Sequence, residues 1–80
     1  MKYYYIKDDM GDYYHRNKHR WLNRESVIPY TSKEKLYKYL SNKESFLWTV
    51  WKHVNWKVVE VEISEEKDVF ALKKENFSEL

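Results

Sequence analysis

Short aromatic runs alternate with polar turns in the N-terminal part of the chain. Residues 2–7 read Lys-Tyr-Tyr-Tyr-Ile-Lys and residues 12–16 read Asp-Tyr-Tyr-His-Arg, and both runs are dense in strand-forming residues. Gly11, the only glycine, lies in the polar segment between them, where a tight turn needs a residue at positive φ. The pattern predicts a β-hairpin. Tyrosine rings can cover a core while their hydroxyls reach water, so the inner face of the first strand stays open.

The next segment is basic. Residues 16–24 are expected to form a loop around Trp21 and Leu22. Residues 26–30 have the composition of a short strand, which Pro29 would confine to a sheet edge or a strand end.

Two helices are predicted in the middle of the chain. Residues 31–34 and 41–44 both have capping-box spacing, which marks a helix start. The first helix is expected to run to about Leu40 and to bury Leu36 and Leu40.

The second helix is expected over residues 43–54. Its apolar residues recur at helical spacing, at Phe46, Leu47, Val50, Trp51 and Val54. Trp48 falls outside this stripe, so it is expected to point into solvent.

The C-terminal part begins with the clearest strand, residues 56–63, in which Val59, Val61 and Ile63 share one face. Residues 64–80 are ambiguous. Ser64 as an N-cap followed by glutamates favours a helix, and this is the preferred interpretation. A strand over 68–73, paired back on 56–63, is the alternative.

These elements predict an α+β fold. A small antiparallel sheet, made of the N-terminal hairpin and strand 56–63, carries two or three helices on one face. The length of 80 residues allows one domain, over 1–80. The absence of cysteine excludes disulfides and thiolate metal sites. The 15 aromatic residues nearly equal the 16 Ile, Leu and Val residues, so aromatic packing must supply much of the stability.

Charge is distributed unevenly along the chain. Residues 1–57 carry 12 Lys and Arg against 6 Asp and Glu, whereas residues 58–80 carry 3 against 7. This pattern indicates either internal neutralisation or a basic face directed at an acidic partner. No secretory leader and no apolar stretch of about 18 residues is apparent, so we expect a cytoplasmic protein without a membrane partner.

Catalysis is not expected. The single glycine excludes a Gly-rich phosphate loop, and no nucleophile motif is present. His15 and His19 have the spacing of a metal pair on a helix, but they fall on a predicted strand and loop, with no cysteine or third histidine close by. We therefore expect no enzyme activity, no cofactor and no metal site.

The basic segment instead indicates binding. It combines four fixed cations with a tryptophan, and Trp48 adds a second ring expected in solvent. Rings of this kind act as desolvated anchors, and the cations around them steer the partner and form salt bridges. The expected partner-binding residues are Arg16, Lys18, Arg20, Trp21, Arg24 and Trp48.

The N-terminal half combines a tyrosine-rich strand ending Ile6-Lys7-Asp8, the Gly11 turn, Trp21, and Ser32-Lys33-Glu34 before Tyr39-Leu40. In these features the chain resembles small accessory proteins encoded by phages and prophages of Gram-positive bacteria. The resemblance covers roughly residues 2–40 and the strand over 56–63, and it implies the cytoplasm of a bacterial host. Many proteins of this kind inhibit host machinery stoichiometrically, including CRISPR effectors and other antiphage systems. Inhibitors that imitate DNA are usually strongly acidic, which this chain is not.

The expected function is therefore a non-enzymatic binding protein, a phage-encoded inhibitor of a host protein or ribonucleoprotein complex such as an antiphage defence (CRISPR) effector, acting by steric occlusion. The alternative is a nucleic-acid or nucleotide binder that uses the basic loop 16–24, with Tyr3, Tyr5 or Tyr13 as stacking platforms. An exposed aromatic patch on so small a chain also leaves a homodimer open.

Overall fold

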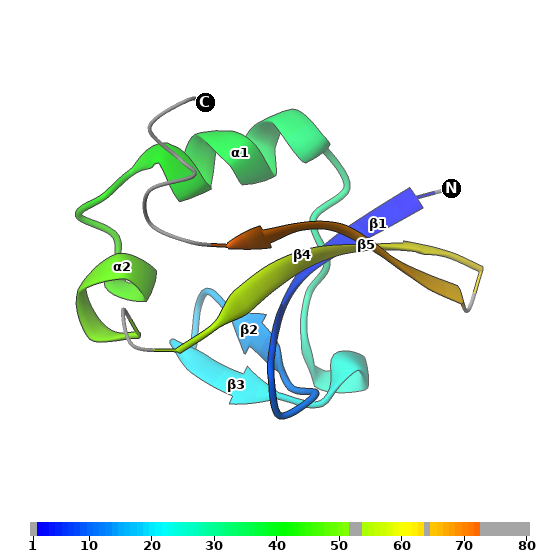
Figure 1. Ribbon diagram of the computed structural model, residues 1–80, viewed down its shortest axis with the longest axis horizontal. Helices are drawn as coiled ribbons and strands as arrows, with labels where there is room; N and C mark the ends of the chain where they lie inside the picture. The colour runs from blue at the N-terminus through cyan, green and yellow to red at the C-terminus, as the bar shows by residue number, and fades with distance from the viewer. Residues whose placement is uncertain (1, 52–53, 64, 73–80) are drawn as a thin grey trace.

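The computed structural model describes residues 2–51, 54–63 and 65–72. Five antiparallel strands form one sheet in the order β3-β2-β1-β4-β5 (Figure 1). The strands are β1 (Lys2–Asp8), β2 (Tyr13–His15), β3 (Arg20–Leu22), β4 (Trp56–Glu62) and β5 (Glu65–Leu72). The helices are the 3-10 turn η1 (Arg24–Ser26), α1 (Lys33–Ser41) and α2 (Phe46–Val50). The predicted α+β class is confirmed in this form, a five-stranded antiparallel sheet with two α-helices.

β1 is the central strand, because it pairs with β2 on one side and with β4 on the other. Its side chains alternate, so that Tyr4 and Ile6 are buried under the helices whereas Tyr5 and Lys7 lie half-buried on the opposite face. The predicted hairpin is confirmed, and Gly11 in its turn has φ +85°. Tyrosines thus line both faces of β1.

The main core lies between the sheet and the two α-helices. Leu36 and Leu40 of α1 are fully buried there, as their spacing predicted. The N-cap of α1 is Ser32, whose hydroxyl accepts a hydrogen bond from the amide of Lys35 at 3.3 Å. The other buried members of this core are Tyr4, Ile6, Tyr14, Tyr30, Leu47, Trp48, Trp56 and Val58.

The expectation that Trp48 points into solvent is wrong. Trp48 is only 2% exposed, its ring meets the Trp56 ring edge-on at 5.1 Å, and its indole Nε1–H donates to the Leu40 carbonyl at 2.8 Å. The cause is the length of α2, which begins after Ser45 and ends at Val50 instead of running over 43–54. So short a helix buries only the adjacent pair Leu47 and Trp48, so the longer apolar stripe does not determine its inward side.

The outward side of α2 carries two residues of the predicted apolar stripe. Phe46 is 39% exposed and Val50 is 41% exposed, although both were expected to be buried. Leu47, between them, is fully buried. The stripe prediction is therefore right for Leu47 and wrong for Phe46 and Val50.

Two further predictions for residues 16–30 are corrected. The segment expected to be a loop contains strand β3, which pairs with β2 through Tyr14 and Trp21. The strand expected over 26–30 is replaced by η1 and a single bridge between Tyr30 and Tyr4. Pro29 cannot donate a ladder hydrogen bond, which agrees with so short a pairing.

The preferred helix over 64–80 is also contradicted. Residues Glu65–Leu72 form β5, which pairs antiparallel with β4 as the alternative predicted. Ile63 lies in the turn between these strands and not on the face of Val59 and Val61. The part of this prediction that falls on residues 73–80 lies outside the described residues.

The second face of the sheet has a smaller core. Tyr13, Val59 and Val27 are buried there, and Tyr5 and Leu22 pack against them. Val27 follows η1 directly, so this short turn brings an apolar residue onto the face that the α-helices leave uncovered.

The burial of Trp48 predicts a large loss of stability when its ring is removed. Trp48→Ala should lower the free energy of unfolding by about 3–5 kcal/mol, because it leaves a cavity between both helices and β4. Trp48→Phe keeps a ring but loses the hydrogen bond to Leu40, so it should cost about 1–2 kcal/mol for the unpaired carbonyl plus any packing loss. Urea unfolding followed by circular dichroism measures both.

The matched control is Phe46→Ala on the outward side of the same helix. It should cost about 1 kcal/mol or less, because the ring is already partly in solvent. Equal losses for Trp48→Ala and Phe46→Ala would show that the Trp48 ring is not buried against the core.

Candidate binding surface

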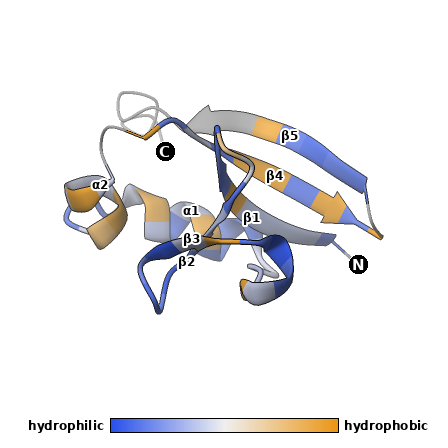
Figure 2. Ribbon diagram, turned by 90° about the horizontal axis from the view of Figure 1, so that it is seen from below, coloured by the Kyte–Doolittle hydropathy of each residue, from blue (hydrophilic) through white to orange (hydrophobic). Residues whose placement is uncertain are grey.

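The turn between β2 and β3, residues 16–19, is built by local hydrogen bonds. The His19 amide donates to the His15 carbonyl at 2.8 Å, and the Lys18 amide donates to Nδ1 of His15 at 3.2 Å. His15 is buried, so the imidazole acts as a fixed acceptor inside the turn. Arg16, Lys18 and Arg20 are all exposed. Figure 2 shows the turn as a hydrophilic loop that projects from the sheet.

His19 holds this turn in one position. Its φ is +54°, in the left-handed region where a residue with a Cβ costs about 1–2 kcal/mol. The ring stacks on Phe46 of α2 with centroids 4.1 Å apart, and its Nδ1 lies 3.2 Å from the Tyr14 hydroxyl. These two contacts offset the backbone cost and tie the turn to both the sheet and α2.

The exposed cations of the turn thus lie next to the exposed apolar side of α2. Phe46 and Val50 are four positions apart and share that side of the helix. We call this surface the turn patch. It comprises Arg16, Lys18, His19, Arg20, Phe46 and Val50.

Arg16 is held against a group of tyrosines. Its guanidinium carbon lies 4.6 Å from the centroid of the Tyr30 ring, which in turn lies 6.2 Å from the ring of Tyr39. Burial raises the pKa of Tyr30 to about 12, outweighing the lowering effect of Arg16, so the phenol stays neutral and its ring face serves as a cation-π partner. The Tyr30 ring therefore holds the guanidinium of Arg16 in place at the surface.

Arg24 does not belong to the turn patch. Its guanidinium donates to Glu66 of β5 at 2.8 Å, on the second face of the sheet. Lys7 donates to the other oxygen of Glu66 at 2.9 Å, and the Tyr13 hydroxyl also donates to this carboxylate. Sequence reasoning placed Arg24 with the other cations of residues 16–24, but the structure gives it to an ion-pair cluster that joins β1, β2, η1 and β5.

The Glu66 carboxylate has a lowered pKa. Burial raises this pKa. The hydrogen bonds from Tyr13 and Lys7 and the charges of Lys7 and Arg24 lower it, and their combined effect is larger than that of burial. An open depression of about 560 Å³ lies beside this cluster, lined by Gly11, Asp12, Tyr13, Asn23, Arg24, Glu25 and Glu66. Its lining carries both signs of charge, so it favours no one class of charged ligand.

Trp21 lies in the main core rather than on the surface. It is half-buried, with its ring centroid 5.2 Å from Tyr14, 6.1 Å from Trp51 and 6.3 Å from Trp56. Of the six predicted contact residues, the structure brings together Arg16, Lys18 and Arg20. It places Trp21 and Trp48 in the core, and Arg24 in the Glu66 cluster.

Sequence reasoning missed Phe46, Val50 and His19 as members of one surface. A helical stripe indicates burial, and only the early end of α2 leaves its first and last residues outside. The left-handed backbone of His19 also has no signal in the sequence, since glycine and asparagine are the usual residues there.

Within the described parts of the chain, no group of three His, Cys, Asp or Glu side chains could hold a metal ion. None of the helices there is long and apolar enough to cross a membrane.

Comparison with known proteins gives no relative. No family model, no curated protein and no solved structure matches the chain.

The lowered pKa of Glu66 predicts a specific pH dependence. A carboxylate whose pKa is lower in the folded than in the unfolded protein stabilises the fold above its unfolded pKa, near 4.5, and this contribution is lost as the pH falls through the folded pKa. Glu66→Gln should cost about 1 kcal/mol at neutral pH, and the cost should shrink below about pH 4.5. Urea unfolding at a series of pH values measures the difference.

Glu65→Gln is the control, because Glu65 lies on the same strand and is exposed. This change should leave stability at neutral pH equal to or slightly above that of wild type, because Glu65 lies directly opposite Glu62. If Glu66→Gln lowers the free energy of unfolding by the same amount at acid and at neutral pH, the ionised Glu66 carboxylate does not stabilise the fold.

Proposed function

We propose that this protein is a non-enzymatic binding protein that docks on an acidic surface of a macromolecular partner through the turn patch. The observation that carries the proposal is the β2–β3 turn itself. Three exposed cations lie on a turn that His19 fixes against an exposed aromatic ring of α2.

The turn patch has the composition of an interface centre with a charged rim. Phe46 and Val50 offer apolar surface that a partner can desolvate, and Arg16, Lys18 and Arg20 offer long side chains for ion pairing around it. The cations also speed encounter with an anionic partner. Because the turn is already fixed by His19, little conformational entropy is lost on binding.

The resemblance to phage accessory proteins extends this proposal. A protein of 80 residues that covers an acidic surface of a host complex would block that surface by occupying it, without chemistry. We propose stoichiometric inhibition of a host complex, such as an antiphage defence (CRISPR) effector in the bacterial cytoplasm, as the biological role. The basic character of the turn patch favours an acidic protein surface over imitation of nucleic acid.

One observation favours a second candidate, binding of single-stranded nucleic acid. His19 and Phe46 are stacked and partly exposed, and three cations lie beside them. Bases stack on such rings while phosphates pair with the cations. Tyr13, one of the platforms expected from the sequence, is only 6% exposed, so stacking would fall to the His19–Phe46 pair instead.

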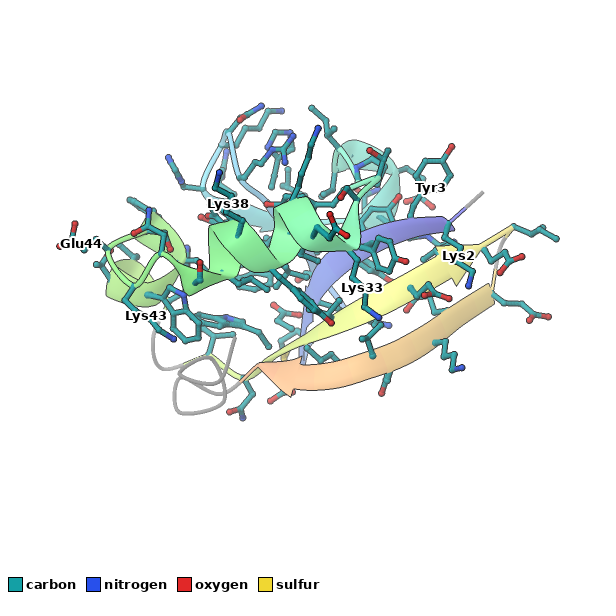
Figure 3. The ribbon with its side chains drawn as sticks, turned by 90° about the horizontal axis from the view of Figure 1, so that it is seen from above. Lys2, Tyr3, Lys33, Lys38, Lys43 and Glu44 are labelled. Carbon is teal, nitrogen blue, oxygen red and sulfur yellow. The ribbon has the colours of Figure 1, made fainter. Side chains whose placement is uncertain are left out.

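The test is affinity capture from a bacterial lysate, with and without nuclease, using wild type and a charge-reversed variant. Lys18→Glu/Arg20→Glu reverses two charges of the turn patch and should lower retention of the partner at least about tenfold. Lys33→Glu/Lys35→Glu makes the same charge change in the first turn of α1 and is the matched control. Figure 3 shows Lys33 at the far end of α1 from Lys43 and α2.

The outcomes separate the two candidates. A protein captured after nuclease by wild type and by the α1 control, but not by the turn variant, supports protein docking. If capture disappears with nuclease, and if the affinity for a single-stranded oligonucleotide of about 15 nucleotides falls steeply with added salt, the function is nucleic-acid binding. Equal capture by the turn variant and wild type would overturn the turn patch as the binding surface.

A further inference from the structure

The turn between β4 and β5 breaks two local rules of stable structure. Ile63 is 94% exposed and has φ +63°, in the left-handed region that β-branched residues essentially avoid. On either side of it, Glu62 and Glu65 are directly opposed across the two strands. Like charges opposed in this way repel one another. We call these three residues, Glu62, Ile63 and Glu65, the acidic tip.

Among the described residues, no ion pair involves Glu62 or Glu65. Lys2 opposes Glu62 in the register between β1 and β4, but its Nζ pairs with Glu60 at 3.5 Å. Glu66 is turned to the second face of the sheet, where Lys7 and Arg24 hold it. Local rules are broken most often where a side chain serves contacts outside its own fold. An exposed isoleucine between two glutamates therefore indicates a contact surface for an apolar site with basic surroundings.

Such a site is present on this same chain. The turn patch has exposed apolar side chains, Phe46 and Val50, next to the cations Lys18 and Arg20. Figures 1 and 2 place the β4–β5 turn at one end of the molecule and α2 with the β2–β3 turn at the other. The longest extent of the molecule is 31 Å, so a tip cannot reach the turn patch of its own copy. It can reach that of a second copy.

We propose that the protein self-associates head to tail, with the acidic tip of one copy docked on the turn patch of the next. Ile63 packs against Phe46 and Val50, and the two glutamates of the tip face Lys18 and Arg20. The contact joins two different surfaces, so it adds copies into chains or rings instead of closing a symmetric pair. The proposal rests on the turn patch of the proposed function. It makes self-association compete with partner binding, since both occupy the same surface.

The test uses two variants that each lack one side of the contact. The tip variant is Ile63→Asn/Glu65→Gln. Because asparagine tolerates the left-handed backbone at position 63, the urea-unfolding midpoint of this variant should be at or above that of wild type. The patch variant is Lys18→Glu/Arg20→Glu. Met10→Asn, on the exposed turn between β1 and β2, is the control for removal of an exposed apolar side chain.

Sedimentation velocity at low salt is measured from about 10 µM to 1 mM, the range of weak association. Wild type and the Met10 control should increase in mass with concentration, and added salt should reverse the increase. Each variant alone should remain monomeric. An equimolar mixture of the two should give a dimer and nothing larger, because only one intact tip and one intact turn patch remain per pair.

Three results would overturn head-to-tail association. They are a wild type that stays monomeric over the whole range, a tip variant that associates as wild type does, and a mixture in which the two variants do not pair. The proposed function is judged separately, because the tip variant keeps the turn patch and should capture the partner at least as well as wild type. A monomeric wild type that still captures its partner would thus refute self-association alone.

Discussion

The packing of Trp48 against Trp56 and Leu40 is the interaction on which the rest of this structure depends. Its ring meets the β4 tryptophan, and its indole N–H donates to the carbonyl of Leu40, the last buried residue of α1, so one side chain joins both helices to the sheet. Because Trp48 points inward, Phe46 and Val50, two positions before and after it, lie on the opposite side of the helix. The residue that closes the core therefore also determines which apolar residues reach the surface.

The same constraint explains why the turn patch is compact. His19 stacks on Phe46, so the position of α2 fixes the position of the β2–β3 turn. An 80-residue chain buries a smaller fraction of its surface than a larger domain does and has little stability to spare. Core rings that also contact residues of the turn, such as Tyr14 and Tyr30, let this chain hold a charged turn in place without additional elements. The turn patch and the core are thus continuous in this protein.

Sequence patterns predicted the elements whose signals are local. The β1–β2 hairpin, α1 with Leu36 and Leu40 buried, and β4 all follow from alternation, capping and the one glycine. Ser64 as a possible N-cap and the glutamates after it favour a helix over 64–80, yet pairing of Glu65–Leu72 with β4 overrides that local preference. The orientation of Trp48 could not be read from periodicity, since it depends on where α2 ends. The separation of Arg24 from the other cations depends on Glu66, which is 42 positions away along the chain.

The most direct test of a pre-formed binding turn is the backbone ¹⁵N relaxation of residues 16–20 in the free protein. If His19 holds the turn against α2 and Tyr14, its order parameters should be near about 0.85, as in the strands on either side. Values below about 0.6 confined to this turn would show a flexible loop. They would contradict a docking surface fixed by the His19–Phe46 stack, and with it the dependence of that surface on the Trp48 core.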